Sequence, residues 1–349
     1  MSIEGQVYDY LNLALNNNFE NGMQFVVFEK DKCIINATVG FKDKNKTEKV
    51  TEDSIFPIFS TTKGVCATLV HIMAERNLLN YNNKMSEYWK DFKADVKVSE
   101  VLKMTAELYE EPDDLSLLDL LNWDYMCIKV ANMLPKKEPS NEFTYHPLTF
   151  GWLAGNLPCL VTGKDFKTLL EEEIKKPLDI KNLYIGAPDE ILNDIIDIYS
   201  DNELDNKLID NEITSVNINQ FISLMNTPLG RKICCPAASG VASAFELAKF
   251  YASFIGYKKP LLNNSQLKKA LEDYIFSPQW GYRAYGYQLS FMDNDKSLDK
   301  VMFGHNGFNG SFAYCDTKNK LAFAFNKNFK SKNSISNRLI KELYKILGA

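Results

Sequence analysis

The sequence predicts an α/β protein of the α+β type: an antiparallel sheet from both termini, flanked by helices, with a mostly helical domain inserted. Two observations predict this class. Strand-like runs occur near both termini, whereas the middle of the 349-residue chain shows helical spacing and few alternating runs. The length suits two domains, so we expect 1–79 and 271–349 to form the sheet domain and 80–270 the helical insert. Ligands commonly bind where two such domains meet.

The first elements follow from local patterns. Residues 6–17 place Val7, Leu11 and Ala14 at helical spacing, which predicts an opening helix. Two strand-like runs joined by a short turn come next, then a brief extended stretch that contains Pro57. A long helix with one apolar face follows. The predicted ranges are 23–29 and 33–39 for the strands, 55–59 for the extended stretch and 61–77 for the helix.

The middle and the end of the chain differ in pattern. Helical spacing recurs through the middle, and alternation returns toward the C-terminus, where a final helix closes the chain. The middle helices are predicted at 97–105, 114–133, 147–162, 164–175, 217–226 and 242–256. The late strands are predicted at 285–292, 300–304, 310–316 and 320–325, and the final helix at 334–347.

Composition excludes several classes of partner. Lysine and arginine total 40 against 45 acidic residues, so the formal net charge is −5, and the chain lacks the cationic surface that nucleic acids require. The N-terminus lacks a signal-peptide pattern, and the longest apolar run, 64–73, is too short to span a membrane. Scattered cysteines without C-x-x-C favour free thiols, so we expect a cytoplasmic protein. Three histidines without H-E-x-x-H indicate no metal and no cofactor.

The sharpest local feature is Phe59-Ser60-Thr61-Thr62-Lys63, at the start of the long predicted helix. Residues three apart share a helical face, so the amine of Lys63 can reach the hydroxyl of Ser60. A poorly solvated amine can take the proton of a serine, and backbone N–H groups at a helix N-terminus stabilise the charge on an attacked carbonyl oxygen. Taken alone, the motif more often marks an N-capping serine beside a solvated lysine.

Two further segments carry groups suited to catalysis. FTYHPLTFGW at 143–152 places a tyrosine, a histidine and a proline just before a predicted helix. FGHNGFNGS at 303–311 places glycines where two predicted strands meet, and glycines allow the backbone to approach a ligand closely.

The order of these motifs resembles that of the serine β-lactamase/penicillin-binding-protein superfamily: Ser-x-x-Lys, then a tyrosine in the helical insert, then His-x-Gly on a late strand. The pattern is similar to that of class C-like β-lactamase-related proteins and family VIII carboxylesterases. Further segments extend the likeness across most of the chain: HIMAERNLLNYNNKMSEYWKDF (71–92), PSNEFTYHPLTFGWLAG (139–155), KKPLDIKNLYIGAP (175–188) and PAASGVASAFELAKFYASF (236–254). The resemblance implies a β-lactamase/transpeptidase-like fold.

The resemblance also implies catalytic roles. It makes Ser60 the acylated nucleophile and Lys63 its activating partner, with Tyr145 as a second base that passes a proton to the leaving group. It implies an oxyanion hole formed by the backbone N–H groups of Ser60 and Phe308.

The remaining candidate residues surround this constellation. His305 stands where related enzymes often have the lysine of K-T-G, and the resemblance implies that it orients or hydrogen-bonds the site. Asn306 and Gly307 belong to the same loop and are expected to line the substrate site. His146, next to Tyr145, either reaches the substrate or serves the core.

Several residues depart from the pattern of class C enzymes. Pro147 replaces an asparagine that supplies a side-chain amide, and His305 replaces a cation that binds the β-lactam carboxylate. Both changes argue against efficient penicillin or cephalosporin hydrolysis. Glu107 stands where related proteins have a glycine, and Ser239-Gly240 replaces a more usual Asn-Gly pair. These changes predict a pocket remodelled for another substrate.

Three functions fit the residues. The first is a serine hydrolase that forms an acyl-Ser60 intermediate on a small ester or amide. The second is an acyltransferase or peptide-cyclising enzyme in which a bound alcohol or amine intercepts that intermediate. The third is a non-catalytic relative that uses the site for binding or assembly. In each case we expect a small-molecule partner rather than a nucleic acid or a membrane, and the sequence does not indicate the oligomeric state.

Overall fold

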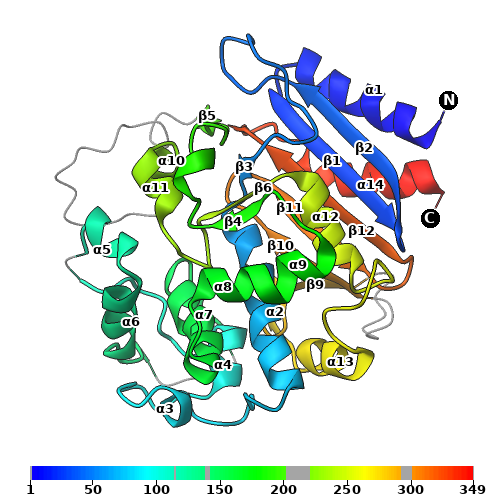
Figure 1. Cartoon of the computed structure of the whole chain (residues 1–349). Helices are drawn as coiled ribbons and strands as arrows, with labels where there is room; N and C mark the ends of the chain where they lie inside the picture. The colour runs from blue at the N-terminus through cyan, green and yellow to red at the C-terminus, as the bar shows by residue number, and fades with distance from the viewer. Residues whose placement is uncertain (1, 114, 138–141, 202–220, 292–300, 349) are drawn as a thin grey trace.

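Both ends of the chain build one antiparallel sheet. The computed structural model describes residues 2–113, 115–137, 142–201, 221–291 and 301–348. Its eight-stranded sheet has the order β2-β1-β12-β11-β10-β9-β8-β7, so β1 from the N-terminal end pairs with β12 from the C-terminal end (Figure 1). The strands are β1 (Gly22–Glu29), β2 (Lys32–Gly40), β7 (Ile275–Ser277), β8 (Gly281–Arg283), β9 (Gln288–Phe291), β10 (Val301–Asn306), β11 (Phe312–Asp316) and β12 (Leu321–Lys327).

Alternating side chains on β12 separate the two faces of this sheet. Leu321, Phe323 and Phe325 belong to a core shared with α1 (Ile3–Asn16) and α14 (Ser336–Leu347). Ala322 and Ala324 point the other way, into the larger core that also contains α2 (Thr62–Glu75) and α12 (Ala244–Ala252). Period-two alternation thus places large residues against α1 and α14 and small residues beneath α12, which packs closely on β12.

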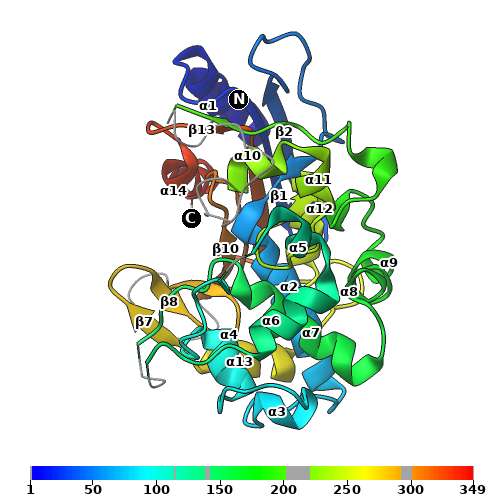
Figure 2. The same cartoon turned by 90° about the vertical axis from the view of Figure 1, so that its left-hand side faces the viewer.

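Most of the other helices gather around α2, beside this sheet (Figures 1 and 2). Most of them come from the middle of the chain. They are α3 (Met85–Tyr88), α4 (Val98–Lys103), α5 (Leu117–Leu121), α6 (Trp123–Ala131), α7 (Thr149–Thr162), α8 (Phe166–Leu170), η2 (Glu171–Lys175), α9 (Lys176–Leu178), η3 (Asp189–Ile191), α10 (Phe221–Met225), α11 (Pro228–Lys232) and α13 (Asn264–Glu272).

Two small sheets complete the structure. One has the order β3-β6-β4 and the other pairs β13 with β5. Their strands are β3 (Phe56–Pro57), β4 (Leu183–Ile185), β5 (Tyr199–Ser200), β6 (Gly240–Ala242) and β13 (Phe329–Lys330).

The predicted fold class is confirmed, but several local predictions are wrong. The helix predicted at 114–133 is broken at Asn122, whose side chain caps α6 by accepting a hydrogen bond from the N–H of Tyr125. The amphipathic helix predicted at 61–77 is instead buried on every side from Thr62 to Met73, because helices and sheet enclose it. Parts of the predictions at 114–133, 217–226, 285–292 and 300–304 lie outside the described residues.

The domain boundaries predicted at 79/80 and 270/271 remain a prediction. Within the range expected for the helical insert, α12 packs on the large sheet. None of the helices in the described parts of the chain is long and apolar enough to cross a membrane.

Candidate active site

Backbone geometry presents Ser60 at the start of α2. The short strand β3 ends at Pro57, and the 3-10 turn η1 (Phe59–Thr61) leads directly into the helix. Phe59 is buried and has φ of +45°, a left-handed conformation that side-chain-bearing residues rarely adopt. Such strain persists only where surrounding packing imposes it. Here the ring of Phe59 packs edge-on against those of Phe221 and Phe308.

A close approach between two segments fixes this turn. Ile58 N–H donates to the carbonyl of Gly240 at 2.9 Å, and Gly240 N–H donates to Thr62 Oγ1 at 3.0 Å. A Cβ added at Gly240 would lie 2.3 Å from that Oγ1, so only glycine fits there. The preceding Ser239 is buried, and its hydroxyl donates to the carbonyl of Ile233 at 2.6 Å. The Ser239-Gly240 pair therefore shapes the loop beside the serine.

The amine of Lys63 is fully buried and contacts three oxygens. Nζ lies 2.7 Å from the carbonyl oxygen of Pro147, 2.9 Å from that of Ala237 and 3.3 Å from Ser60 Oγ. A neutral amine has two N–H donors and one lone pair. The two carbonyls can occupy both donors, which leaves the lone pair for the hydroxyl of Ser60.

Electrostatics favour that neutral form. Burial lowers the pKa of Lys63 below its ordinary value, because the charged amine loses its hydration, and Arg283 lowers it further. The phenol of Tyr145 acts in the opposite direction and raises the pKa of Lys63. Because burial is the largest influence, Lys63 is suited to accept a proton from Ser60.

Tyr145 lies against the same amine. Lys63 Nζ is 4.8 Å from the centre of the Tyr145 ring, and this ring stacks on Trp280 with centroids 5.0 Å apart. Arg283 approaches the ring as well, with Cζ 5.2 Å from its centre. The structure therefore brings the ring of Tyr145, from a distant segment, next to the amine of Lys63, which in turn faces the hydroxyl of Ser60.

The loop after β10 lies over the serine turn. A Cβ added at Gly307 would meet the carbonyl oxygen of Ile58 at 2.6 Å, which shows how closely the two segments approach. Phe308 is partly exposed, and within the described residues neither its N–H nor that of Ser60 has a hydrogen-bond partner. Two such N–H groups on adjacent segments are suited to bind a developing oxyanion. Asn306, by contrast, donates its N–H to Gln288 Oε1 at 2.8 Å.

Asn309 connects this loop to the rest of the fold. Its Nδ2 donates to the carbonyl of Lys327 at 2.9 Å and to that of Pro57 at 3.4 Å, while its Oδ1 accepts the N–H of Ser311 at 3.1 Å. The side chain therefore links the loop that carries Phe308 both to β12 and to the strand that precedes Ser60. Asn309 lies within the 303–311 segment, but nothing in the sequence distinguishes it from its neighbours.

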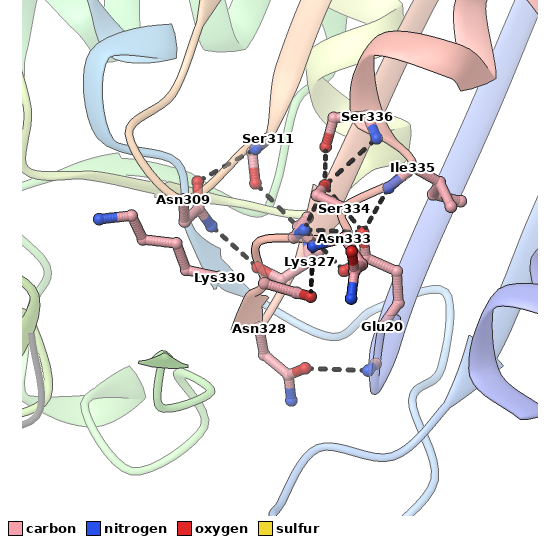
Figure 3. A network of polar contacts seen from close by, with 12 residues as sticks. Glu20, Asn309, Ser311, Lys327, Asn328, Lys330, Asn333, Ser334, Ile335 and Ser336 are labelled. Atoms are coloured by element: carbon pink, nitrogen blue, oxygen red, sulfur yellow. Dashed lines mark hydrogen bonds and ion pairs between the residues drawn. The ribbon is translucent and has the colours of Figure 1, made fainter. Parts of the chain in front are cut away.

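A buried ion pair lies behind that loop (Figure 3). Lys327 Nζ is 2.6 Å from Glu20 Oε2, and both side chains are fully buried. Lys327 also donates to Ser334 Oγ at 2.7 Å, and Glu20 Oε1 accepts the N–H of Ile335 at 3.0 Å just before α14. The pair thus joins β12, the start of α14 and the segment before β1.

His305 is held by a buried arginine. Its Nδ1 donates to the carbonyl of Asn306 at 2.7 Å, so Nε2 is left as the acceptor, 3.3 Å from both terminal nitrogens of Arg283. Burial, Arg283 and Lys63 all lower the pKa of His305 well below its ordinary value. The imidazole is therefore neutral, with both ring nitrogens engaged. No motif in the sequence marks Arg283, which ends β8 after a turn that the sequence patterns do not predict.

His146 forms a hydrogen bond with the loop at 104–108 instead of facing the substrate site. It is fully buried, its Nδ1 donates to the carbonyl of Thr144 at 2.6 Å, and its Nε2 accepts the N–H of Leu108 at 3.1 Å. Burial lowers its pKa to about 3. The expectation that His146 reaches the substrate therefore finds no support here, since both nitrogens bind backbone.

Glu107 is also buried in this loop. Its carboxylate accepts a hydrogen bond from Thr144 Oγ1 and lies 3.6 Å from Lys137 Nζ. Its φ is +55°, in the region that favours glycine, so its backbone retains the shape expected of the glycine that it replaces. Across the described residues, no group of three or more His, Cys, Asp or Glu side chains is placed to hold a metal ion.

Comparison with known proteins places this site in a family. Residues 15–344 match the Beta-lactamase family, and the chain therefore belongs to it. It is 33% identical over 171 residues to the "Esterase/beta-lactamase LipL" of Mycobacterium tuberculosis. That alignment covers 48% of this chain and only 39% of the relative, so the chain spans about two fifths of the length of that protein.

Solved structures share the whole fold. A family VIII carboxylesterase superposes with a TM-score of 0.82, over 99% of this chain and 98% of the other, at 23% identity. EstA from Arthrobacter nitroguajacolicus Rue61a superposes with a TM-score of 0.81, over 98% and 97% of the two chains, at 20% identity. At these identities the likeness establishes the fold, which is the β-lactamase/transpeptidase fold.

Proposed function

We propose that this chain is a serine hydrolase that cleaves small esters or amides through an acyl-Ser60 intermediate. One observation carries the proposal: Lys63 Nζ, fully buried, binds two backbone carbonyls and faces Ser60 Oγ at 3.3 Å. A buried amine held in this way is a base rather than a surface charge. The esterase names of the relative and of the two structures agree with it.

The reaction divides between the three side chains. Ser60 Oγ attacks the acyl carbonyl while its proton passes to Lys63 Nζ, and the N–H groups of Ser60 and Phe308 bind the oxyanion. The tetrahedral intermediate then expels the alcohol or amine, which takes a proton from Tyr145, and Lys63 returns its extra proton to Tyr145. Water attacks acyl-Ser60 and gives a proton to the same pair. The acid leaves when Ser60 Oγ regains that proton.

The charges of His305 and Arg283 favour neutral acyl substrates over β-lactams. The β-lactam nucleus carries a carboxylate that needs an accessible cation. His305 is neutral and engaged, and Arg283 is fully buried, so neither presents an accessible positive charge to the substrate. We therefore expect p-nitrophenyl esters to be cleaved faster than nitrocefin.

The test is hydrolysis of p-nitrophenyl acetate and butyrate by the wild-type chain and by Ser60→Ala. We expect loss of turnover in the variant, with unchanged circular dichroism. Equal rates in the two proteins would refute the hydrolase proposal and leave the non-catalytic alternative. The same assay with added alcohols or amines tests the acyltransferase alternative, which requires a new ester or amide at the expense of free acid.

A further inference from the structure

Arg283 is a buried cation with an unusual set of partners. Its side chain is fully buried, and the guanidinium carbon lies 5.2 Å from the ring centre of Tyr145 and 5.5 Å from that of Phe143. The two terminal nitrogens contact His305 Nε2, and Nε has no hydrogen-bond partner in the described part of the chain. Within the described residues, no carboxylate is among the groups that act on its charge. A buried charge is normally paired, because burial removes its hydration.

We infer that Arg283 is a positioning residue of this site: His305 fixes its guanidinium against the ring of Tyr145, where its permanent positive charge favours the neutral amine of Lys63, the form that accepts the proton of Ser60. The inference rests on the proposed acylation of Ser60. It explains why a fully buried cation lies against the ring of Tyr145 and within electrostatic reach of Lys63. It also gives His305 a function, since a neutral acceptor can hold the guanidinium without cancelling its charge.

The electrostatic reasoning concerns the charge of Lys63. As an ammonium, Lys63 carries a positive charge, and a fixed cation nearby disfavours that form. Lys63 therefore loses its proton at lower pH than it would without Arg283.

Arg283 stays positively charged near neutral pH. Burial lowers the pKa of Arg283 to about 10, and attraction to Tyr145 partly opposes that effect, so the guanidinium is still a cation at neutral pH. A carboxyl group, that of Glu111, also faces Lys63, and burial raises its pKa. The histidines and Tyr314 near Arg283 do not cancel the charge of the guanidinium. Burial lowers the pKa of His305 and of His146, and raises that of Tyr314, so these side chains are neutral. The described titratable groups that face Arg283 are Lys63, Tyr145, His146, His305 and Tyr314.

The experiment is the pH dependence of Ser60 labelling by a fluorophosphonate, measured as the rate of single adduct formation by intact mass. The comparison set is the wild type, Arg283→Gln and Arg283→Lys. Arg231→Gln is the matched control, because this other buried arginine pairs with Asp197. We expect the acid limb of the profile to move up by about one pH unit or more in Arg283→Gln. It should stay near the wild-type position in Arg283→Lys and in Arg231→Gln.

A second pair of variants tests the charge without removing Arg283. His305→Asp places a carboxylate beside the guanidinium, whereas His305→Asn has similar size and no charge. The inference predicts an upward shift of the acid limb in the aspartate variant and little shift in the asparagine variant. Equal acid limbs in this pair, or in wild type and Arg283→Gln, would overturn the inference. Complete absence of Ser60 labelling in the wild type would instead refute the proposed function.

Discussion

Lys63 Nζ lies 2.7 Å from the carbonyl oxygen of Pro147, closer than its 3.3 Å separation from Ser60 Oγ. The sequence marked Pro147 only for the side-chain amide that it lacks. In the structure, the backbone carbonyl of Pro147, just before α7, accepts a hydrogen bond from the amine of Lys63. This contact does not depend on the side chain at position 147. The lysine is therefore positioned by main-chain atoms, which a change of side chain does not remove.

Replacement of Lys63 tests its role as the base. Lys63→Met retains an unbranched chain of similar length in a fully buried position, so the fold should survive. We expect the rate of Ser60 labelling to fall by about 10²-fold to 10⁴-fold, the usual contribution of a general base. Lys249→Met is a matched control, because Lys249 is also buried and pairs with Glu246 on α12. Labelling of Lys63→Met at the wild-type rate would contradict the assignment.

Asn309 should matter although it touches no reacting atom. Asn309→Ala removes the hydrogen bonds that join the Phe308 loop to Pro57 and Lys327. We expect kcat for p-nitrophenyl acetate to fall about 10-fold, less than the loss of a direct oxyanion donor would cause. The exposed Asn337→Ala on α14 serves as the control. An unchanged kcat in Asn309→Ala would show that this side chain does not position the oxyanion loop.

The Glu20–Lys327 pair provides a stability test. Glu20→Gln or Lys327→Met alone leaves one buried charge without its partner, and each should lower the free energy of unfolding by about 3–5 kcal/mol. The double variant should cost clearly less than the sum of the two, because neither charge remains. Urea unfolding of the four proteins measures the coupling. If the loss of unfolding free energy in the double variant equals the sum of the two single losses, the two charges do not stabilise each other.

The buried histidines predict a loss of stability in acid. Burial lowers the pKa of His71 to about 4 and that of His146 to about 3. Below about pH 6.5, these histidines bind protons in the unfolded chain but not in the folded state. The free energy of unfolding is therefore highest above that pH, and it falls as the pH drops toward the folded-state pKa values. At pH 5 each such histidine should cost about 2 kcal/mol.

Urea unfolding at pH 7.5, 6 and 5 measures this loss. His71→Gln removes one titrating group while keeping hydrogen-bonding atoms for Tyr81 and the carbonyl of Tyr285. Its stability should fall less steeply over the same range. If wild type and His71→Gln lose the same free energy of unfolding between pH 7.5 and pH 5, His71 is not a cause of the loss.

Sequence patterns were sufficient for the fold class because the core strands alternate strongly. On β12, Leu321, Phe323 and Phe325 face one core while Ala322 and Ala324 face the other, and such alternation is visible without coordinates. The helix α2 was mispredicted as amphipathic, since its polar residues Thr68 and His71 are buried through tertiary contacts. Long-range packing of this kind leaves no local signal.

The same distinction applies to the candidate site. Ser60, Lys63 and Tyr145 lie in recognisable motifs, and the structure brings them together. Arg283 and the carbonyl of Ala237 carry no motif, because their importance comes from where β8 and the loop before β6 lie in space. For His146, the sequence left a substrate contact and a core role open, and both of its ring nitrogens bind backbone atoms in the buried interior.

The most direct measurement is peptide mass spectrometry of the wild-type chain after reaction with a fluorophosphonate near neutral pH. We predict one adduct per molecule, located on the peptide that contains Ser60, and none in Ser60→Ala under the same conditions. An adduct on another serine, or no adduct on a chain that still cleaves p-nitrophenyl acetate, would contradict a covalent mechanism at this residue.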